Sequence, residues 1–156
     1  MTDAGMYYSE KGDELKRYCT YDGMGFRMLQ EAGILTGIIT TEKVEMNIRR
    51  ARKLKLEIVS IGVEDKVAEA RRIWAETGIL PEETAYIGDD INCLPLLRIV
   101  GWAACPPNSR KPIKEVPGIT LLQTPGGHGA VREFAELVLD TIPGYEPKMP
   151  WKNFGN

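Results

Sequence analysis

Two adjacent aspartates, Asp89 and Asp90, are the residues of this chain best suited to chemistry. They follow the apolar run at residues 84–87, and neighbouring carboxylates repel each other unless a cation lies beside them. Mg²⁺ relieves this repulsion, because it takes one or two protein carboxylates and completes its shell with water and phosphate oxygens. The structural alternative is an Asx turn with an N-cap for the segment after Ile91. The pair alone leaves both interpretations open.

A threonine and a lysine occupy similar places after two other apolar runs. Thr40 ends the run that begins at Ile34, and its hydroxyl can donate to a phosphate oxygen. Lys66 follows residues 58–61, and its ammonium can neutralise a phosphate or a nucleophilic carboxylate. The alternatives are a helix cap for Thr40 and a solvated first-turn residue for Lys66. Taken with the aspartate pair, these groups form a phosphoryl-transfer site that lacks only a nucleophile.

Such a site needs a scaffold that brings the ends of separate strands together. Hydrophobic periodicity predicts strands at residues 34–39, 58–61, 84–87, 100–105 and 119–122, helices at 24–32, 42–55, 64–77 and 130–139, and loops at 81–83 and 106–117. Strands at 6–8 and 15–21 enclose turn residues and predict a hairpin, which Asp22-Gly23 ends. Alternating strands and helices indicate an α/β fold with a parallel sheet covered on both faces. Chemistry in such sheets gathers beyond the carboxyl ends of the strands, so the three sites should meet there.

Composition excludes several classes of protein. The chain has 156 residues, of which 43% are apolar, and a net charge of -2 gives no basic excess for binding nucleic acid. No apolar run approaches the roughly 20 residues of a membrane span, and residues 1–5 do not resemble a signal peptide. Three widely spaced cysteines and one histidine argue against disulfides and structural zinc. We expect a cytoplasmic protein, with one domain at residues 1–142 and a loosely held tail at 143–156.

Six segments, in their order and spacing, resemble a known enzyme family. They are TDAGMYYSEKGDELKRY, YDGMGFRMLQEAGI, GIITTEK, GVEDK, AYIGDD and PGGHGAVREF. They are similar to the cap-less haloacid dehalogenase-type phosphatases of 3-deoxy-octulosonate 8-phosphate and nonulosonate 9-phosphates, and to the phosphatase-like domain of some acylneuraminate cytidylyltransferases. The resemblance runs from Thr2 to about Leu139. It implies a Rossmann-like fold, dependence on Mg²⁺, a sugar-phosphate substrate and a homotetramer assembled by the hairpin.

The resemblance also implies roles for individual residues. Thr40 matches the phosphate-binding hydroxyl, Lys66 matches the lysine that steadies the nucleophile and the phosphate, and Asp89 matches the metal-binding aspartate beside Asp90. The implied substrate-binding residues are Thr41, Glu42, Arg50, Lys53 and Arg132. Arginine is usual at position 42 in the octulosonate enzymes, so Glu42 favours a nine-carbon sugar.

Three departures from the family pattern bear on activity. The family opens with a strand ending in Asp-x-Asp-Gly, which carries the nucleophile and the general acid and base. That motif should lie just before Thr2, so we expect the natural protein to extend upstream of Met1. Without the motif the sheet would lack its central strand, and the neighbouring strands would expose apolar edges. Cys93 stands where the family often has another acid near the metal, and Thr41 replaces a usual glycine.

Two functions of different classes follow. The first is a Mg²⁺-dependent phosphatase of a 2-keto-3-deoxy sugar phosphate, inactive without its nucleophile motif. The second is a non-catalytic oligomerisation or regulatory domain, which the loss of an acid at Cys93 favours. A receiver domain is excluded, because Lys66 precedes the aspartate pair and receivers have the reverse order.

Overall fold

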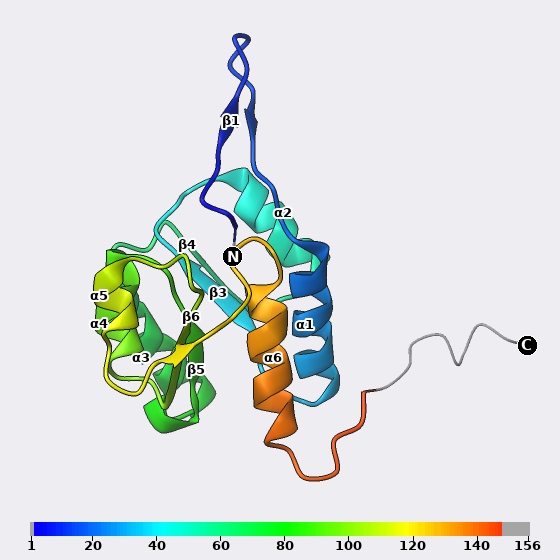
Figure 1. Ribbon diagram of the computed structural model, residues 1–156, viewed down its shortest axis with the longest axis vertical. Helices are drawn as coiled ribbons and strands as arrows, with labels where there is room; N and C mark the ends of the chain where they lie inside the picture. The colour runs from blue at the N-terminus through cyan, green and yellow to red at the C-terminus, as the bar shows by residue number, and fades with distance from the viewer. Residues whose placement is uncertain (1, 148–156) are drawn as a thin grey trace, which may run out of the picture.

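The computed structural model describes residues 2–147, which form two parallel sheets, a projecting hairpin and the helices around them (Figure 1). One sheet pairs β3 (Gly37–Thr40) with β4 (Ile58–Ile61), and the other has the order β5 (Ala85–Ile87), β6 (Trp102–Cys105), β7 (Thr120–Leu121). The helices are α1 (Thr20–Glu31), α2 (Glu45–Lys53), α3 (Lys66–Thr77), α4 (Leu94–Leu97), α5 (Lys111–Lys114) and α6 (Ala130–Asp140), with 3₁₀ turns η1 (Pro81–Glu83) and η2 (Ile91–Cys93). The predicted α/β class and parallel strands are confirmed.

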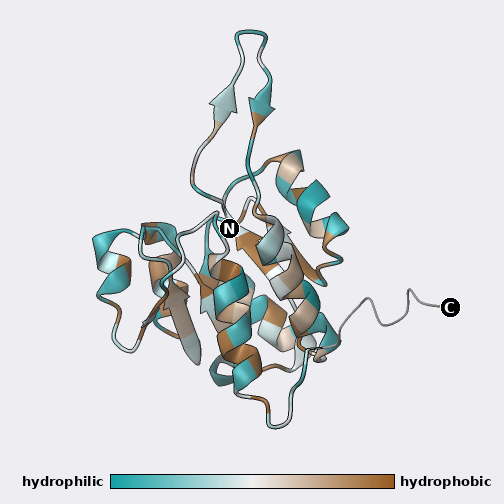
Figure 2. Cartoon of the chain, turned by 45° about the vertical axis from the view of Figure 1, so that its right-hand side comes forward, coloured by the Kyte–Doolittle hydropathy of each residue, from teal (hydrophilic) through white to brown (hydrophobic). Residues whose placement is uncertain are grey.

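The main core surrounds β6, the one described strand with a neighbour on each side. Successive residues of a strand point to opposite faces, so Ala103 and Cys105 join one buried cluster and Ala104 the other. On the second face the rings of Trp102 and Phe134 meet edge to face, with their centroids 5.5 Å apart. Figure 2 shows apolar residues concentrated on the inner strands and on the inward sides of the helices. The predicted cover of helices on both faces is present here.

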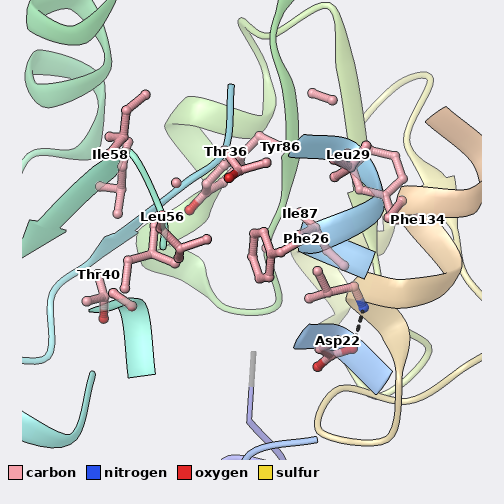
Figure 3. A pocket seen from close by; sticks show the side chains of 18 of the residues that line it. Asp22, Phe26, Leu29, Thr36, Thr40, Leu56, Ile58, Tyr86, Ile87 and Phe134 are labelled. Carbon is pink, nitrogen blue, oxygen red and sulfur yellow. Dashed lines mark hydrogen bonds between the residues drawn. The ribbon is translucent and has the colours of Figure 1, made fainter. Parts of the chain in front are cut away.

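Between β3 and β5 the sheet is interrupted. A cavity of about 580 Å³ separates the two strands, and we call it the β3–β5 slot (Figure 3). Its lining is mainly apolar and includes Phe26, Leu29, Ile38, Ile87, Phe134 and Val138. Native interiors contain few voids larger than a water molecule, so a space of this size in the middle of a parallel sheet is exceptional. Within residues 2–147 no strand pairs with both β3 and β5 across this space.

Helices α1 and α6 lie side by side along the slot (Figure 1). A Cβ added at Gly25 would lie 3.0 Å from the Cα of Arg132 and 3.2 Å from the Cβ of Ala135, so glycine permits the close approach. The prediction that Asp22-Gly23 breaks the chain before this helix was wrong, since α1 already begins at Thr20. The local turn signal is overridden because Asp22 is buried against α6.

Helix α3 is tied to β4 by Glu69. Its carboxylate accepts a hydrogen bond of 2.5 Å from the Ser60 hydroxyl and bonds of 2.6 and 3.0 Å from the Arg72 guanidinium. The bonds from Arg72 and then from Ser60 lower the pKa of Glu69 to about 2. The carboxylate therefore anchors α3 in its ionised form.

The predicted hairpin is present and projects from the body of the molecule (Figures 1 and 2). Its strands β1 (Tyr7–Tyr8) and β2 (Glu14–Leu15) are antiparallel, with Tyr7 opposite Leu15. The predicted strand at 15–21 was too long, because its last residues enter α1. Tyr7, Tyr8 and Leu15 are exposed by 59%, 70% and 64%, so the arm presents apolar surface to its surroundings.

The remaining differences from the sequence prediction are local. Helix α2 is shorter than the predicted 42–55, and residues 81–83 form a 3₁₀ turn where a loop was predicted. The proline-rich stretch at 106–117 contains α5, whose proline lies in the first turn, where no amide donor is needed. Within residues 2–147 no helix is long and apolar enough to cross a membrane. Of the predicted tail, residues 148–156 lie outside the described part of the chain.

Candidate active site

The three predicted strand-end groups line the same cavity. Thr40 ends β3, Lys66 opens α3 after β4, and Asp89 follows β5, and all three contribute to the lining of the β3–β5 slot. The register places Thr40 opposite Ile61, so β3 and β4 end together and direct their loops to one edge. The carboxyl ends of parallel strands therefore gather the groups as the sequence predicts.

Lys66 is buried, with only 7% of its surface exposed, which rules out the solvated alternative. Its Nζ lies 3.2 Å from the Sγ of Cys93 and 3.4 Å from the hydroxyl of Tyr86. Burial, followed by the charge of Cys93, raises the pKa of Tyr86, so the phenol is neutral. No carboxylate pairs with this buried ammonium in the described part of the chain, so an anion bound beside it would offset the cost of burying the charge.

The hydroxyl of Thr40 is an acceptor in the described part of the chain. Its Oγ1 accepts a bond of 3.2 Å from the amide of Glu42. It does not cap α2, because that helix begins at Glu45 and its N-cap residue is Val44. The hydroxyl proton of Thr40 can therefore be donated to an anion at the end of β3.

The two aspartates have different environments. Asp90 accepts a bond of 2.7 Å from the amide of Ile91 and caps η2, which is the structural role considered for it. Asp89 is half-buried on the slot lining. Among residues 2–147 no group of three His, Cys, Asp or Glu side chains could hold a metal ion. Mg²⁺ accepts a single protein carboxylate when waters and a phosphate complete its shell, so Asp89 fits as one ligand of a shared site.

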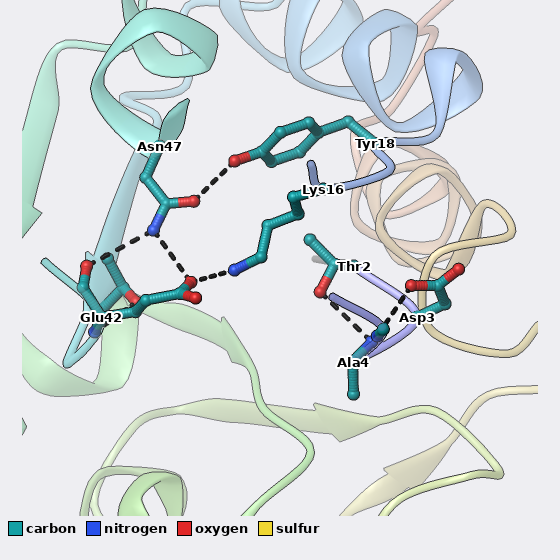
Figure 4. Close-up of polar contacts among 9 residues, drawn as sticks. Thr2, Asp3, Ala4, Lys16, Tyr18, Glu42 and Asn47 are labelled. Carbon is teal, nitrogen blue, oxygen red and sulfur yellow. Dashed lines mark hydrogen bonds and ion pairs between the residues drawn. The ribbon is translucent and has the colours of Figure 1, made fainter. Parts of the chain in front are cut away.

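A second polar group joins the base of the hairpin to the slot (Figure 4). Glu42 accepts hydrogen bonds from Lys16 and from the amide of Asn47, the latter at 3.1 Å. Burial alone would raise the pKa of Glu42, but these bonds outweigh it and lower the pKa. Tyr18 donates to Asn47 at 2.7 Å, and the guanidinium of Arg50 lies 5.7 Å from the Tyr18 ring. Glu42 and Arg50 are thus held rigidly at the mouth of the slot.

Four of the predicted residues do not line the slot. Thr41 is exposed and accepts a bond of 2.8 Å from Asn92, and Lys53 is exposed at the end of α2. Arg132 pairs with Glu136 at 2.7 Å, and Asp90 is the cap described above. Their roles toward a substrate or metal stay predictions.

Sequence reasoning missed Asp22, Tyr86 and the partnership of Cys93 with Lys66. Asp22 is 4% exposed and lines the slot; its Oδ1 bonds to α6, while its Oδ2 has no partner in the described part of the chain. An Asp-Gly pair is a common turn signal, so the local sequence pointed away from this role. Of these three features, only the contact of Cys93 with Lys66 could have been predicted from the sequence, because Cys93 lies four residues after Asp89.

Comparison with known proteins agrees with this geometry. No family model matches the chain. The chain is 32% identical over 139 residues to 3-deoxy-D-manno-octulosonate 8-phosphate phosphatase of Yersinia pestis, covering 89% of this chain and 74% of that protein. The solved structure of the same enzyme from Moraxella catarrhalis, in complex with magnesium, phosphate and its sugar, has a TM-score of 0.85 at 33% identity, covering 89% of this chain and 79% of that one.

A third match comes from the wider superfamily to which these phosphatases belong. A putative haloacid dehalogenase (HAD) family hydrolase from Streptomyces avermitilis matches with a TM-score of 0.84 and 31% identity over 90% of this chain and 79% of its own. The expected resemblance and fold are confirmed. With identity above 30% over about three quarters of these proteins, the chain belongs to the family of the 3-deoxy-D-manno-octulosonate 8-phosphate phosphatases of the haloacid dehalogenase superfamily.

Proposed function

We propose that this protein is a Mg²⁺-dependent phosphatase of a 2-keto-3-deoxy sugar phosphate. The observation that carries the proposal is the convergence of Thr40, Lys66 and Asp89 on one cavity in a chain of this family. These three groups supply a hydroxyl donor, a fixed positive charge and a metal ligand, which are the parts that phosphoryl transfer requires apart from the nucleophile.

Each residue has a defined task in the reaction. Thr40 donates its hydroxyl proton to a phosphoryl oxygen, and the ammonium of Lys66 stabilises the charge that grows on the phosphoryl group. Asp89 would hold Mg²⁺, which would supply Lewis-acid stabilisation of the charge on the phosphoryl group. Relatives have been solved with magnesium and with cobalt, which supports a divalent metal here.

The resemblance implies that an aspartate of an Asp-x-Asp-Gly strand supplies the nucleophile. Its first aspartate attacks phosphorus in line while the sugar oxygen leaves, and its second protonates that oxygen. The ammonium of Lys66, which contacts only a phenol and a thiol in the described part of the chain, is placed to receive the first carboxylate.

The substrate is the 8-phosphate of an octulosonate, in line with the named relatives, or the 9-phosphate of a nonulosonate. Glu42, Arg50 and the two positions further out, Thr41 and Lys53, contact the sugar. The acidic Glu42, half-buried beside Lys16, favours the longer sugar because its carboxylate can accept a hydrogen bond from the additional hydroxyl.

The protein assembles as a homotetramer in the cytoplasm through its hairpin. The exposed Tyr7, Tyr8 and Leu15 supply apolar contact surface on an arm that has few contacts with its own body (Figure 1). In the assembly Arg132 and the glycine-rich turn before it approach a neighbouring site. Sedimentation of the chain and of Tyr8→Lys, with a tetramer converted to smaller species, tests this assembly.

A second function is a non-catalytic assembly or regulatory domain. The contact of Lys66 with Cys93 in place of an acid favours it, because a thiol does not strengthen a cation site. Turnover by the natural full-length protein discriminates between the two functions.

The test begins with the intact mass and N-terminal peptides of the protein from its native source. The full-length chain so identified is then assayed for phosphate release from the sugar 8- and 9-phosphates, with Mg²⁺ and with EDTA. We expect Mg²⁺-dependent release that falls about 100-fold or more in Lys66→Met and is unchanged in Lys111→Ala, an exposed lysine of α5. A full-length chain without activity on either sugar would favour the assembly domain.

A further inference from the structure

Lys66 and Cys93 form a buried pair of reactive side chains. The Nζ of Lys66 lies 3.2 Å from the Sγ of Cys93, and the hydroxyl of Tyr86 lies 3.4 Å from each of these atoms. Only 7% of Lys66 and 4% of Cys93 is exposed. The described part of the chain therefore holds a positive charge in contact with a thiol, and no carboxylate pairs with that charge.

The hydrogen bonds around the sulfur give it a defined orientation. Cys93 donates its thiol proton toward the Oδ1 of Asn92 at 3.4 Å, so the lone pairs of Sγ face Lys66 and Tyr86. An ammonium has donors alone. Burial raises the pKa of Tyr86, so its phenol also keeps a proton to donate. A thiol sulfur is a weak acceptor and makes poor use of these two donors, whereas an oxygen atom bonded to the sulfur would accept from both.

The contact with an ammonium distinguishes Cys93 from the other two cysteines. Cys105 is fully buried, and burial raises the pKa of its thiol, which keeps it in the less reactive protonated form. Cys19 precedes α1, is half-buried, and makes no capping bond with its side chain. Within residues 2–147 only the thiol of Cys93 is hydrogen-bonded to an ammonium. A positive neighbour favours anionic products on sulfur, so the three thiols should differ in reactivity.

Two cavities adjoin the pair. Lys66 and Cys93 both line the β3–β5 slot. Lys66 also lines a second cavity of about 450 Å³, together with Asn92 and Pro95, which flank Cys93 in the sequence. Hydrogen peroxide is little larger than water, and both spaces are many times the volume of a water molecule. The low exposure of Cys93 therefore leaves a path to its sulfur for a small oxidant.

We propose that Cys93 is a modification site for peroxides, which convert its thiol to a sulfenate held by Lys66. The sulfur attacks one oxygen of hydrogen peroxide, and an S–O bond forms as the O–O bond breaks. The other oxygen leaves with the thiol proton as water, and the new sulfenic acid releases its own proton to solvent. Sulfur is oxidised by two electrons, and the peroxide is reduced by the same two.

The surroundings of Cys93 retain the sulfenate. Its oxygen accepts hydrogen bonds from the Lys66 ammonium and the Tyr86 phenol, and the charge of this oxyanion compensates the buried charge of Lys66. The modification rests on these contacts and not on the proposed function. Its effect on catalysis does rest on that function, because an ammonium paired with a sulfenate attracts a phosphate less strongly.

The test is oxidation of the chain by a small excess of hydrogen peroxide. One series contains dimedone, a carbon nucleophile that captures sulfenic acids, and its labelled cysteines are measured by peptide mass spectrometry. We expect Cys93 to be labelled at least about tenfold faster than Cys19 or Cys105. In a series without dimedone, the intact mass should rise by one oxygen atom and return to its original value when dithiothreitol is added.

Two comparisons separate the effect of the charge from that of exposure. In the chain unfolded in urea, where Lys66 no longer contacts the sulfur, the labelling rates of the three cysteines should agree within about threefold. Lys66→Met keeps the length of the side chain without the ammonium and should slow the labelling of Cys93 about tenfold. The matched control Lys111→Met removes an exposed lysine of α5 and should leave the rate unchanged. The comparison with urea needs no variant, so it decides the matter should Lys66→Met fail to fold.

Three outcomes would overturn the proposal. One is labelling of Cys19 as fast as that of Cys93 in the folded chain, because exposure alone would then set the rate. Another is an unchanged rate at Cys93 in a folded Lys66→Met variant. The last is a product that loses two free thiols and gains no oxygen, which would identify a disulfide with Cys105, a member of the same buried cluster. Phosphatase activity enters none of these measurements, so failure of the proposed function leaves the modification site standing.

Discussion

Replacement of Asp22 by alanine tests whether a residue of α1 caps α6. The Oδ1 of Asp22 accepts bonds of 3.1 and 3.2 Å from the amides of Val131 and Arg132, in the first turn of α6. The N-cap residue of that helix, Gly129, has no side chain to do so. The first-turn donors of α6 therefore depend on a carboxylate that lies more than a hundred residues earlier in the chain.

The magnitude follows from three contributions. Loss of an N-cap costs about 1 to 2 kcal/mol, and loss of a carboxylate at the positive end of a helix costs about 0.3 to 1 kcal/mol. Removal of the partnerless Oδ2 returns about 1 kcal/mol, because that atom is buried without a hydrogen bond. We expect Asp22→Ala to lower the free energy of unfolding by about 0.3 to 2 kcal/mol and the melting temperature by about 1 to 8 °C.

The assay is urea unfolding at pH 7 together with hydrogen exchange at the amides of Val131 and Arg132. Asp22→Asn keeps an acceptor for both amides, so it should lose less than half as much stability and keep their protection. Asp140→Ala removes an exposed acid at the other end of the same helix and should change stability by less than about 0.5 kcal/mol. Equal losses in the alanine and asparagine variants of Asp22, or no loss in either, would refute the capping argument.

The remaining predictions concern the ionised carboxylate of Glu69, the contact of Cys93 with Lys66, and the close packing of α1 on α6 at Gly25. The pKa of Glu69 is lowered to about 2 in the folded state, so its contribution to stability is complete above pH 4.5 and is lost as the pH falls toward 2. Glu69→Gln should therefore lower the urea midpoint at pH 7. Near pH 2 the urea midpoints of the variant and the parent should become equal. Cys93→Asp gives Lys66 a carboxylate partner and should raise the melting temperature by differential scanning calorimetry, whereas Cys93→Ser should not. Gly25→Ala places a methyl group 3.0 Å from the Cα of Arg132 and should cost about 1 to 3 kcal/mol in chemical unfolding; a neutral result would mean that the two helices separate readily.

Prediction from sequence succeeded where the signal is local. The short apolar runs predicted β3, β4, β5 and β6 as strands, and helical spacing predicted α3 and α6, although of these strands only β6 is mostly buried within residues 2–147. The position of polar residues directly after such runs predicted the shared location of Thr40, Lys66 and Asp89, since parallel strands end at one edge. The element limits were less accurate, because caps and frayed turns depend on neighbours in space.

Prediction failed where distant segments decide the outcome. Asp22-Gly23 has the composition of a turn, but both residues lie in helix α1, where the carboxylate of Asp22 caps α6. In the same helix Gly23 packs against Arg50 of α2, and Gly25 packs against Arg132 of α6. The burial of Lys66 also lies beyond local pattern, because it depends on Tyr86 and Cys93 closing over its ammonium. The hairpin strands were overextended because the tyrosines of residues 15–21 have strand propensity whether or not a partner is present.

The sequence by itself determined the class of fold, the edge of the sheet where chemistry gathers and the family to which the chain belongs, since periodicity, strand-end residues and ordered motifs are all properties of the linear chain. Only the tertiary structure of residues 2–147 decided that no strand joins β3 to β5, that Lys66 is buried beside Tyr86 and Cys93, and that Asp22 caps a helix far along the chain. The physical reason is that cavities, buried charges and unpaired strand edges depend on contacts between segments that are distant in the sequence, and these contacts form only when the chain folds.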